Sequence, residues 1–246
     1  MINFTHIFQD CWNFVRNQQK ITLQFTALLF IVSVFALFFK QSIQTDTLEL
    51  SETISNTETL QLSHYLFISG LLRMFISAWG ILTIHQLSQH IEPQLSQSVI
   101  STTKRFGGLL LLNILIAIPL GIGTSEILVS ALMHKSPSIF SLFALALGIF
   151  VFVRLNLLNV HYLIHNHSIS QSLKTMWKSG VKRTHLLFLY TLINCLLPLL
   201  LRQLSLFLSH NLFMEILITA IISLADVFLL IFTYRFYTLF MQQRGQ

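Results

Sequence analysis

The sequence predicts an all-α integral membrane protein, a bundle of six transmembrane helices with amphipathic interfacial helices on the cytoplasmic side. Of its 246 residues, 54% are hydrophobic and only 10% are charged, whereas soluble domains are roughly 25% charged. The apolar residues gather in runs long enough to cross the hydrocarbon core of a bilayer. We therefore expect a single membrane domain over residues 1–246, without a separate soluble enzyme.

The first predicted crossing, residues 21–39, lies between Lys20 and Lys40 and follows an amphipathic segment, residues 4–15. It is not followed by a small-residue cleavage site, so we expect it to remain as a membrane anchor. The next stretch, residues 41–64, has acidic but no Lys or Arg residues and is expected outside. The other crossings are predicted at residues 65–87, 106–127, 138–158, 186–201 and 212–234.

Amphipathic segments precede three of the crossings. They cover residues 4–15, residues 91–105 and the stretch that begins near Ile169, and each is followed by two crossings, which suggests the hypothesis of an internal repeat. In the third segment, Met176 and its apolar neighbours are expected to face acyl chains. Tryptophan favours the headgroup layer, and lysine is attracted to anionic lipid. The predicted interfacial lipid contacts are Trp12, Lys174, Trp177, Lys178 and Lys182.

Basic residues are distributed unequally along this predicted threading. With both termini in the cytoplasm, eleven Lys and Arg residues lie on the cytoplasmic side, and only Lys40, Lys135 and Arg202 lie outside. This bias supports the orientation, because Lys and Arg beside crossings are retained in the cytoplasm. The net charge of +6 does not indicate nucleic-acid binding, since the basic residues are scattered among apolar runs. Anionic headgroups of membrane lipids are the expected partners.

Among the ionisable residues inside the predicted crossings, where an unpaired charge is costly, are Arg73, Arg154, Glu215 and Asp226. Counted at about 1.5 Å per residue, Arg154 and Asp226 have similar depth, and we expect them to form a charge pair between the fourth and sixth crossings. Arg73 can reach toward Glu215, which makes these two a candidate intramembrane polar site, or it can extend toward the outer surface. Both arrangements are more typical of packing than of an ion pathway.

No metal or cofactor is expected. His161, His165 and His167 have a spacing that could serve zinc, because histidines at i and i+4 share a helix face. Polar residues at the membrane interface are the preferred interpretation, since no acidic residue lies between Arg154 and Arg183 to support a metal site. The two cysteines lack disulfide or metal spacing, and nucleotide-binding and hydrolase motifs are absent from the sequence. We therefore expect no enzymatic activity.

Three short motifs stand out near the start, in the third amphipathic segment and at the end of the sixth crossing. They are Asp10 with Asn13-Phe14 and Arg16-Asn17-Gln18, then Ser170-x-Ser172-Leu173-Lys174-x-x-Trp177, and finally Tyr234-Arg235-Phe236-Tyr237. Through them the chain resembles the YciC-like family of uncharacterised bacterial inner-membrane proteins. The resemblance implies six crossings and an inner-membrane location, and it supplies no activity and no site residues.

Two functions are compatible with these features. The preferred hypothesis is a non-enzymatic role in envelope or lipid organisation, because the amphipathic segments face lipid and no polar path crosses the midplane. The alternative is a small-solute or lipid transporter. Its basis is Arg73 together with the segment 119–123, where proline and glycines favour a kink or break in the third crossing. A transporter requires a polar cavity near Arg73, which a closed apolar bundle would exclude.

Overall fold

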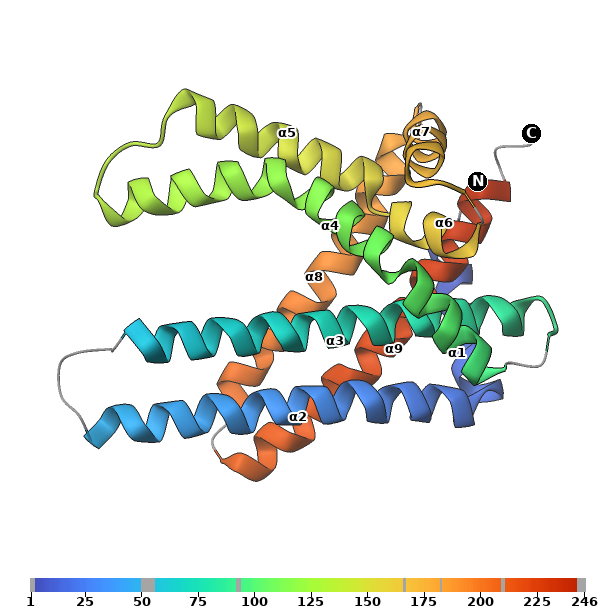
Figure 1. Cartoon of the computed structure of the whole chain (residues 1–246). Helices are drawn as coiled ribbons and strands as arrows, with labels where there is room; N and C mark the ends of the chain where they lie inside the picture. Colours follow the sequence, from blue (N-terminus) through green and yellow to red (C-terminus); the bar gives the residue numbers. More distant parts are fainter. Residues whose placement is uncertain are drawn as a thin grey trace. The chain divides into compact units, whose positions relative to one another are not determined.

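The fold consists of helices and their connections, without strands, in the part of the chain that the computed structural model describes, residues 3–49, 56–91, 94–165, 167–181, 183–208 and 211–242. Side chains of residues 39–63, Leu206 and Leu208 lie outside this description. Figure 1 shows the arrangement of the helices. They are α1 (Phe4–Asn17), α2 (Gln19–Glu49), α3 (Asn56–Ser88), α4 (Leu95–Leu132), α5 (Ile139–Leu155), α6 (Leu158–Ile164), α7 (Ile169–Ser179), α8 (Thr184–Leu208) and α9 (Leu212–Gln242).

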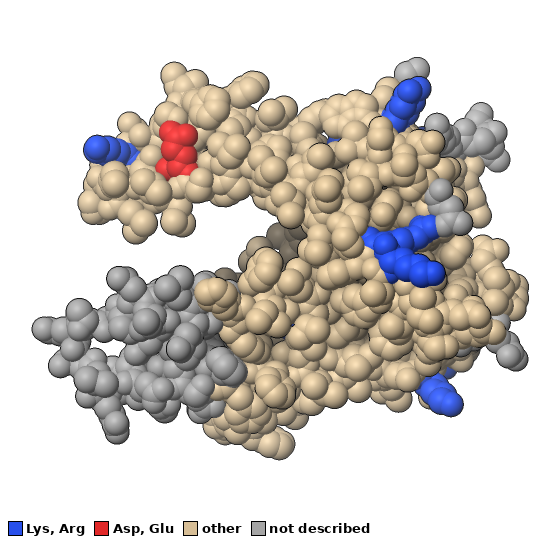
Figure 2. Space-filling view, in the orientation of Figure 1, with Lys and Arg blue, Asp and Glu red and all other residues tan. Residues whose placement is uncertain are grey.

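Six stretches of the described helices are long and apolar enough to cross a membrane, judged by length and composition. This confirms the all-α prediction and the number of candidate crossings. Large apolar side chains are exposed along them, including Phe35 and Phe67 at 66% each and Ile139 at 87%. Most of the face in Figure 2 is correspondingly free of charged side chains. Such a surface suits acyl chains, because soluble proteins rarely expose apolar area on this scale.

The chain divides into two compact units. Among the described residues, unit 1 comprises residues 85–195 and 233–242, and unit 2 comprises residues 3–84 and 196–232. The helices α3, α8 and α9 each contribute residues to both. Because the units are described separately, the single membrane domain stays a prediction.

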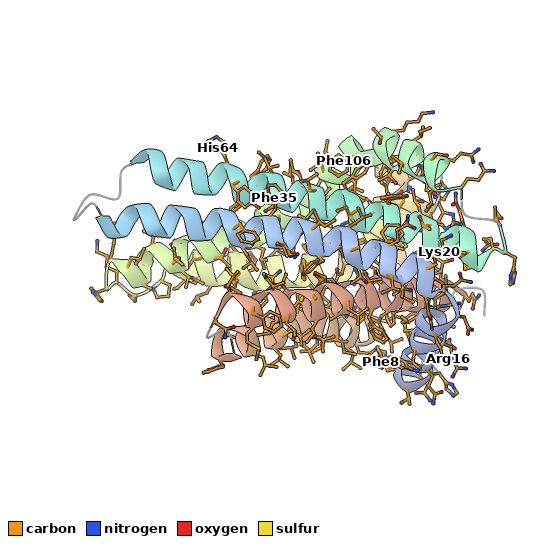
Figure 3. All side chains as sticks on the ribbon, turned by 90° about the horizontal axis from the view of Figure 1, so that it is seen from below. Phe8, Arg16, Lys20, Phe35, His64 and Phe106 are labelled. Carbon is orange, nitrogen blue, oxygen red and sulfur yellow. The ribbon has the colours of Figure 1, made fainter. Side chains whose placement is uncertain are left out.

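In unit 2, α1 runs across the end of α2 instead of continuing it, and Figure 3 shows Phe8 and Arg16 on this crossing helix. The two helices are separated at Gln18, whose backbone leaves the helical conformation. The Phe8 ring stacks on Phe232 of α9 with centroids 5.0 Å apart, and Ile7 and Cys11 are fully buried. The apolar arc that was expected to face lipid therefore packs largely against protein.

In unit 1, α4 and α5 form a hairpin whose two helices lie side by side (Figure 1). Glycines permit this close packing: a Cβ at Gly123 would lie 2.5 Å from the Leu145 nitrogen, and one at Gly148 would lie 2.7 Å from the Leu120 Cα. Pro119 lies inside α4, which is assigned as one helix from Leu95 to Leu132. Of the predicted kink or break in the third crossing, the break does not occur, and the backbone beside the proline packs closely against Gly148.

The second amphipathic segment is also different from the prediction. Residues 95–105 form the first turns of α4 instead of a separate surface helix, and Ser98 and Thr102 are fully buried. Ser98 donates a hydrogen bond to the side-chain oxygen of Gln86, 2.8 Å away. No proline separates this segment from the apolar run that follows, so one helix continues through both.

Candidate ligand-binding cavity

Unit 2 contains a cavity of about 440 Å³ between four helices. This volume is within the range of roughly 300–1,000 Å³ that is usual for small-molecule sites. Two of the cavity's lining residues, Ala36 and Leu37, directly follow Phe35, which Figure 3 shows about midway along α2. The lining residues are Ser33, Ala36 and Leu37 of α2, Leu66, Ser69, Gly70 and Arg73 of α3, Arg202 and Ser205 of α8, and Glu215, Thr219 and Ile222 of α9.

An ion pair lies beside this cavity. Arg73 Nη1 is 3.6 Å from Asp226 Oδ2, and the two side chains are only 30% and 25% exposed. Arg73 Nη2 also donates a hydrogen bond to Ser33 Oγ, which in turn donates to the Leu29 carbonyl at 2.6 Å. The guanidinium is therefore held by two helices, as expected where an unpaired charge is costly.

Two further charges of opposite sign line the cavity. Arg202 is exposed and Glu215 is half-buried. The ion pair that the structure shows among the described residues joins Arg73 to Asp226, so Arg202 and Glu215 are not paired with each other. The cavity thus presents one cation and one carboxylate that can each accept a ligand group of opposite charge.

Hydroxyl groups complete the polar lining. Ser69 donates to the Leu66 carbonyl at 3.0 Å, Ser205 donates to the carbonyl of Arg202 at 2.6 Å, and Thr219 donates to that of Glu215 at 2.7 Å. Each hydroxyl hydrogen is used within its own helix, and the oxygen keeps lone pairs that can accept. These oxygens therefore suit a hydrogen-bond donor on a ligand.

The structure places the predicted polar site, Arg73 and Glu215, on one cavity. Arg202 was missed as a site residue, since sequence reasoning placed it in a short outer loop. Arg202 lies one helical turn before Ser205 at the end of an apolar run, and this position indicates a site residue only weakly.

Arg154 and Asp226 each have a partner within their own unit. Asp226 pairs with Arg73 in unit 2. In unit 1, Arg154 Nη2 donates to the Trp177 carbonyl at 3.0 Å, and its guanidinium lies 4.8 Å from the centre of the Trp177 ring. Depth counting could not find these partners, because it does not say which way a side chain points around its helix. The Arg154–Asp226 pair joins two separately described units and stays a prediction.

The predicted interfacial residues are on two helices. Trp12 of α1 is 63% exposed, whereas Trp177 of α7 is 40% exposed and packs edge-on against Phe150. Lys174 and Lys178 are exposed, and Lys182 lies outside the described residues. Met176 is fully buried with Ser172, and α7 packs on α5 and α6. The prediction that Met176 faces acyl chains is therefore wrong.

A second polar cluster in unit 1 involves the predicted histidines. His161 is 1% exposed, and its Nδ1 is 2.7 Å from the Tyr237 hydroxyl, which is also 3.1 Å from His165 Nε2. Burial lowers the pKa of His165, and the nearby His167 and Arg105 lower it further. His161 is thus buried in the protein. Within the described ranges, the structure has no group of three or more residues arranged to hold a metal ion.

The motif at the end of the sixth predicted crossing is buried as well. Tyr234 is 1% exposed, and its hydroxyl is 3.0 Å from His85 Nδ1. Phe236 is fully buried and stacks on Tyr190 with centroids 4.6 Å apart. These aromatic residues form a core in unit 1.

The fold and the cavity together define a class, a helical protein whose described residues form six helices suited to crossing a membrane, with a charged cavity among four of them. The chain belongs to the same family as a protein of Haemophilus influenzae that carries the name "Uncharacterized protein". The two are 40% identical over 243 residues, which cover 98% of this chain and 99% of the relative. No family model matches the chain, and no solved structure matches it.

Proposed function

We propose that this chain is a multi-pass protein of the bacterial inner membrane that transports a small solute or a lipid, with the unit 2 cavity as its substrate site. The observation that carries the proposal is the charged and hydroxyl-lined cavity around Arg73. Polar groups inside membrane helices are costly and mark substrate pathways. The proposal assigns the protein no catalytic step. Because α4 is unbroken, it does not rest on a discontinuous third crossing.

The proposed orientation has both termini in the cytoplasm. Figure 3 shows Arg16 and Lys20 at one end of unit 2 and His64 toward the other end. The cavity residues Leu66 and Arg202 are near the ends of their apolar stretches, away from the basic end. Basic residues favour the cytoplasmic side, so this orientation opens the cavity toward the outer face. The same proposal includes the location in the inner membrane and membership of the YciC-like family.

The second candidate is a role in envelope or lipid organisation. It is favoured by the exposed Trp12 of α1 and the exposed Lys174 and Lys178 of α7. Tryptophan and lysine on short amphipathic helices suit the headgroup layer and anionic lipids. In this case the cavity would hold a lipid without moving it.

Reconstitution into liposomes tests the transport proposal. A fluorescent phospholipid and a panel of radiolabelled amino acids and sugar phosphates serve as probes, with empty liposomes as the baseline. We expect saturable movement of at least one probe, reduced about tenfold or more in an R202Q/E215Q double variant. K135Q, in the turn between α4 and α5, is the matched control and should behave as the unaltered protein. Movement equal to the empty-liposome rate for every probe would favour the second candidate.

A further inference from the structure

We infer that the unit 2 cavity recognises a zwitterion with an ammonium group and an anionic group, and that its source is a phospholipid headgroup of the ethanolamine type. This inference deepens the proposed function and rests on it for the identity of the site. It follows from the charges, the hydroxyl groups and the exposed apolar rim of the cavity.

Charge balance is the first argument. The charges of Arg73 and Asp226 compensate each other, so this pair adds little net charge to the cavity. The other charges that line the cavity are the guanidinium of Arg202, which also attracts Asp226, and the carboxylate of Glu215, and neither of them forms a direct ion pair with a described residue. A purely anionic ligand would leave the Glu215 carboxylate without a cationic partner. A purely cationic ligand would leave the Arg202 guanidinium without an anionic partner. A ligand that carries both charges satisfies both groups.

Hydrogen-bond direction is the second argument. The hydroxyls of Ser69, Ser205 and Thr219 donate to carbonyls of their own helices and turn acceptor lone pairs to the cavity. A primary ammonium has three donors, which match the Glu215 carboxylate and these oxygens. A quaternary ammonium has no such donor. The lining therefore selects a primary amine over a choline group.

The rim of the cavity is the third argument, and it favours a lipid over a free solute. Leu66 lines the cavity and is 57% exposed, and Phe67 and Phe35, which adjoin the lining residues Leu66 and Ala36 in the sequence, are each 66% exposed. A headgroup in the cavity would leave acyl chains beside these apolar side chains. The acyl chains would stay in the bilayer and hold the headgroup beside the cavity, because lipid tails and these side chains are similarly apolar. A free zwitterion of the same charge pattern would have no such anchor.

The test uses the full-length protein purified in detergent and supplied with lipids that share the same acyl chains. Phosphatidylethanolamine, phosphatidylcholine and phosphatidylglycerol are compared by retained lipid in native mass spectrometry. We expect phosphatidylethanolamine to be retained about tenfold more than either of the others. Equal retention of all three lipids would overturn the inference.

Two variants test which charged group of the headgroup Glu215 and Arg202 each bind. E215Q should lower phosphatidylethanolamine retention about tenfold and change phosphatidylglycerol retention little, whereas R202Q should lower both. K135Q is again the control. Retention of phosphatidylethanolamine by E215Q at the unaltered level would contradict the inference. Both residues are at least partly exposed, and elution as a single size-exclusion peak shows that each variant is folded.

Soluble phosphoethanolamine distinguishes the source of the zwitterion and needs no variant. We expect it to displace the retained lipid only at concentrations far above those of the lipid. Displacement at equal concentrations would assign the site to a free zwitterion and overturn the lipid assignment. Selective retention of phosphatidylethanolamine without its movement in liposomes would refute the transport proposal and leave the lipid site standing. Movement of another solute without lipid selectivity would refute the lipid site and leave the transport proposal standing.

Discussion

At position 226 an aspartate inside an apolar helix is held by an arginine 3.6 Å away on another helix. Removing one partner leaves the other charge without compensation, which costs 3–5 kcal/mol in fully buried pairs. Since both side chains are partly exposed, we discount this figure for screening. We expect D226N or R73Q to lower the free energy of unfolding by about 2 kcal/mol, measured by denaturation in detergent micelles.

The double variant R73Q/D226N provides the control for this pair. It removes both charges, so we expect its loss of unfolding free energy to be smaller than the sum of the losses in the two single variants. Purely additive losses would show that the two side chains do not interact.

At position 165 the pKa of a histidine is lowered by burial and by the positive charges of neighbouring groups. The folded state therefore binds fewer protons here than the unfolded state, and stability rises with pH. This contribution is present above the unfolded pKa of about 6.5 and is lost as the pH falls below it. We expect H165Q to flatten the pH dependence of the melting temperature. An unaltered pH dependence in H165Q would contradict the assignment.

Among the helices, the α4–α5 hairpin gives the sharpest prediction. A Cβ at Gly123 or Gly148 would collide with the backbone of the facing helix, whereas nothing lies within 4 Å of a Cβ at Gly121. We expect G123A and G148A each to destabilise the protein by about 1–3 kcal/mol. G121A is the matched control on α4 and should be neutral or slightly stabilising. Equal melting temperatures for G121A and G123A would contradict the close packing.

The sequence predicted helices better than it predicted their faces. Apolar runs of bilayer length identified all six candidate crossings, because length and composition decide that property. The arcs through Ile7 and Met176 looked equally suited to lipid, yet both residues are buried in protein. Lipid and a protein core are both apolar, so periodicity alone cannot distinguish them. The pairing of Arg73 with Asp226 was missed because it depends on how α3 and α9 are rotated about their axes.

At the scale of the whole molecule, we propose that the unit 2 cavity is part of a transport pathway. Transport requires that the cavity be reached by water from both sides of the membrane in turn. In a background of C11A and C195S, a cysteine at Ser69 reports this access through its reaction with a membrane-impermeant maleimide. Leu111 is 51% exposed on the apolar surface of α4, so L111C is the control that should react from neither side.

The most direct measurement is the labelling of S69C in right-side-out and inside-out vesicles. We expect rapid labelling from the outer side and slower but definite labelling from the cytoplasmic side. Added phosphatidylethanolamine should slow the labelling from both sides. Labelling from the outer side alone would contradict transport and leave a static lipid site, and no labelling from either side would contradict the cavity as a ligand site.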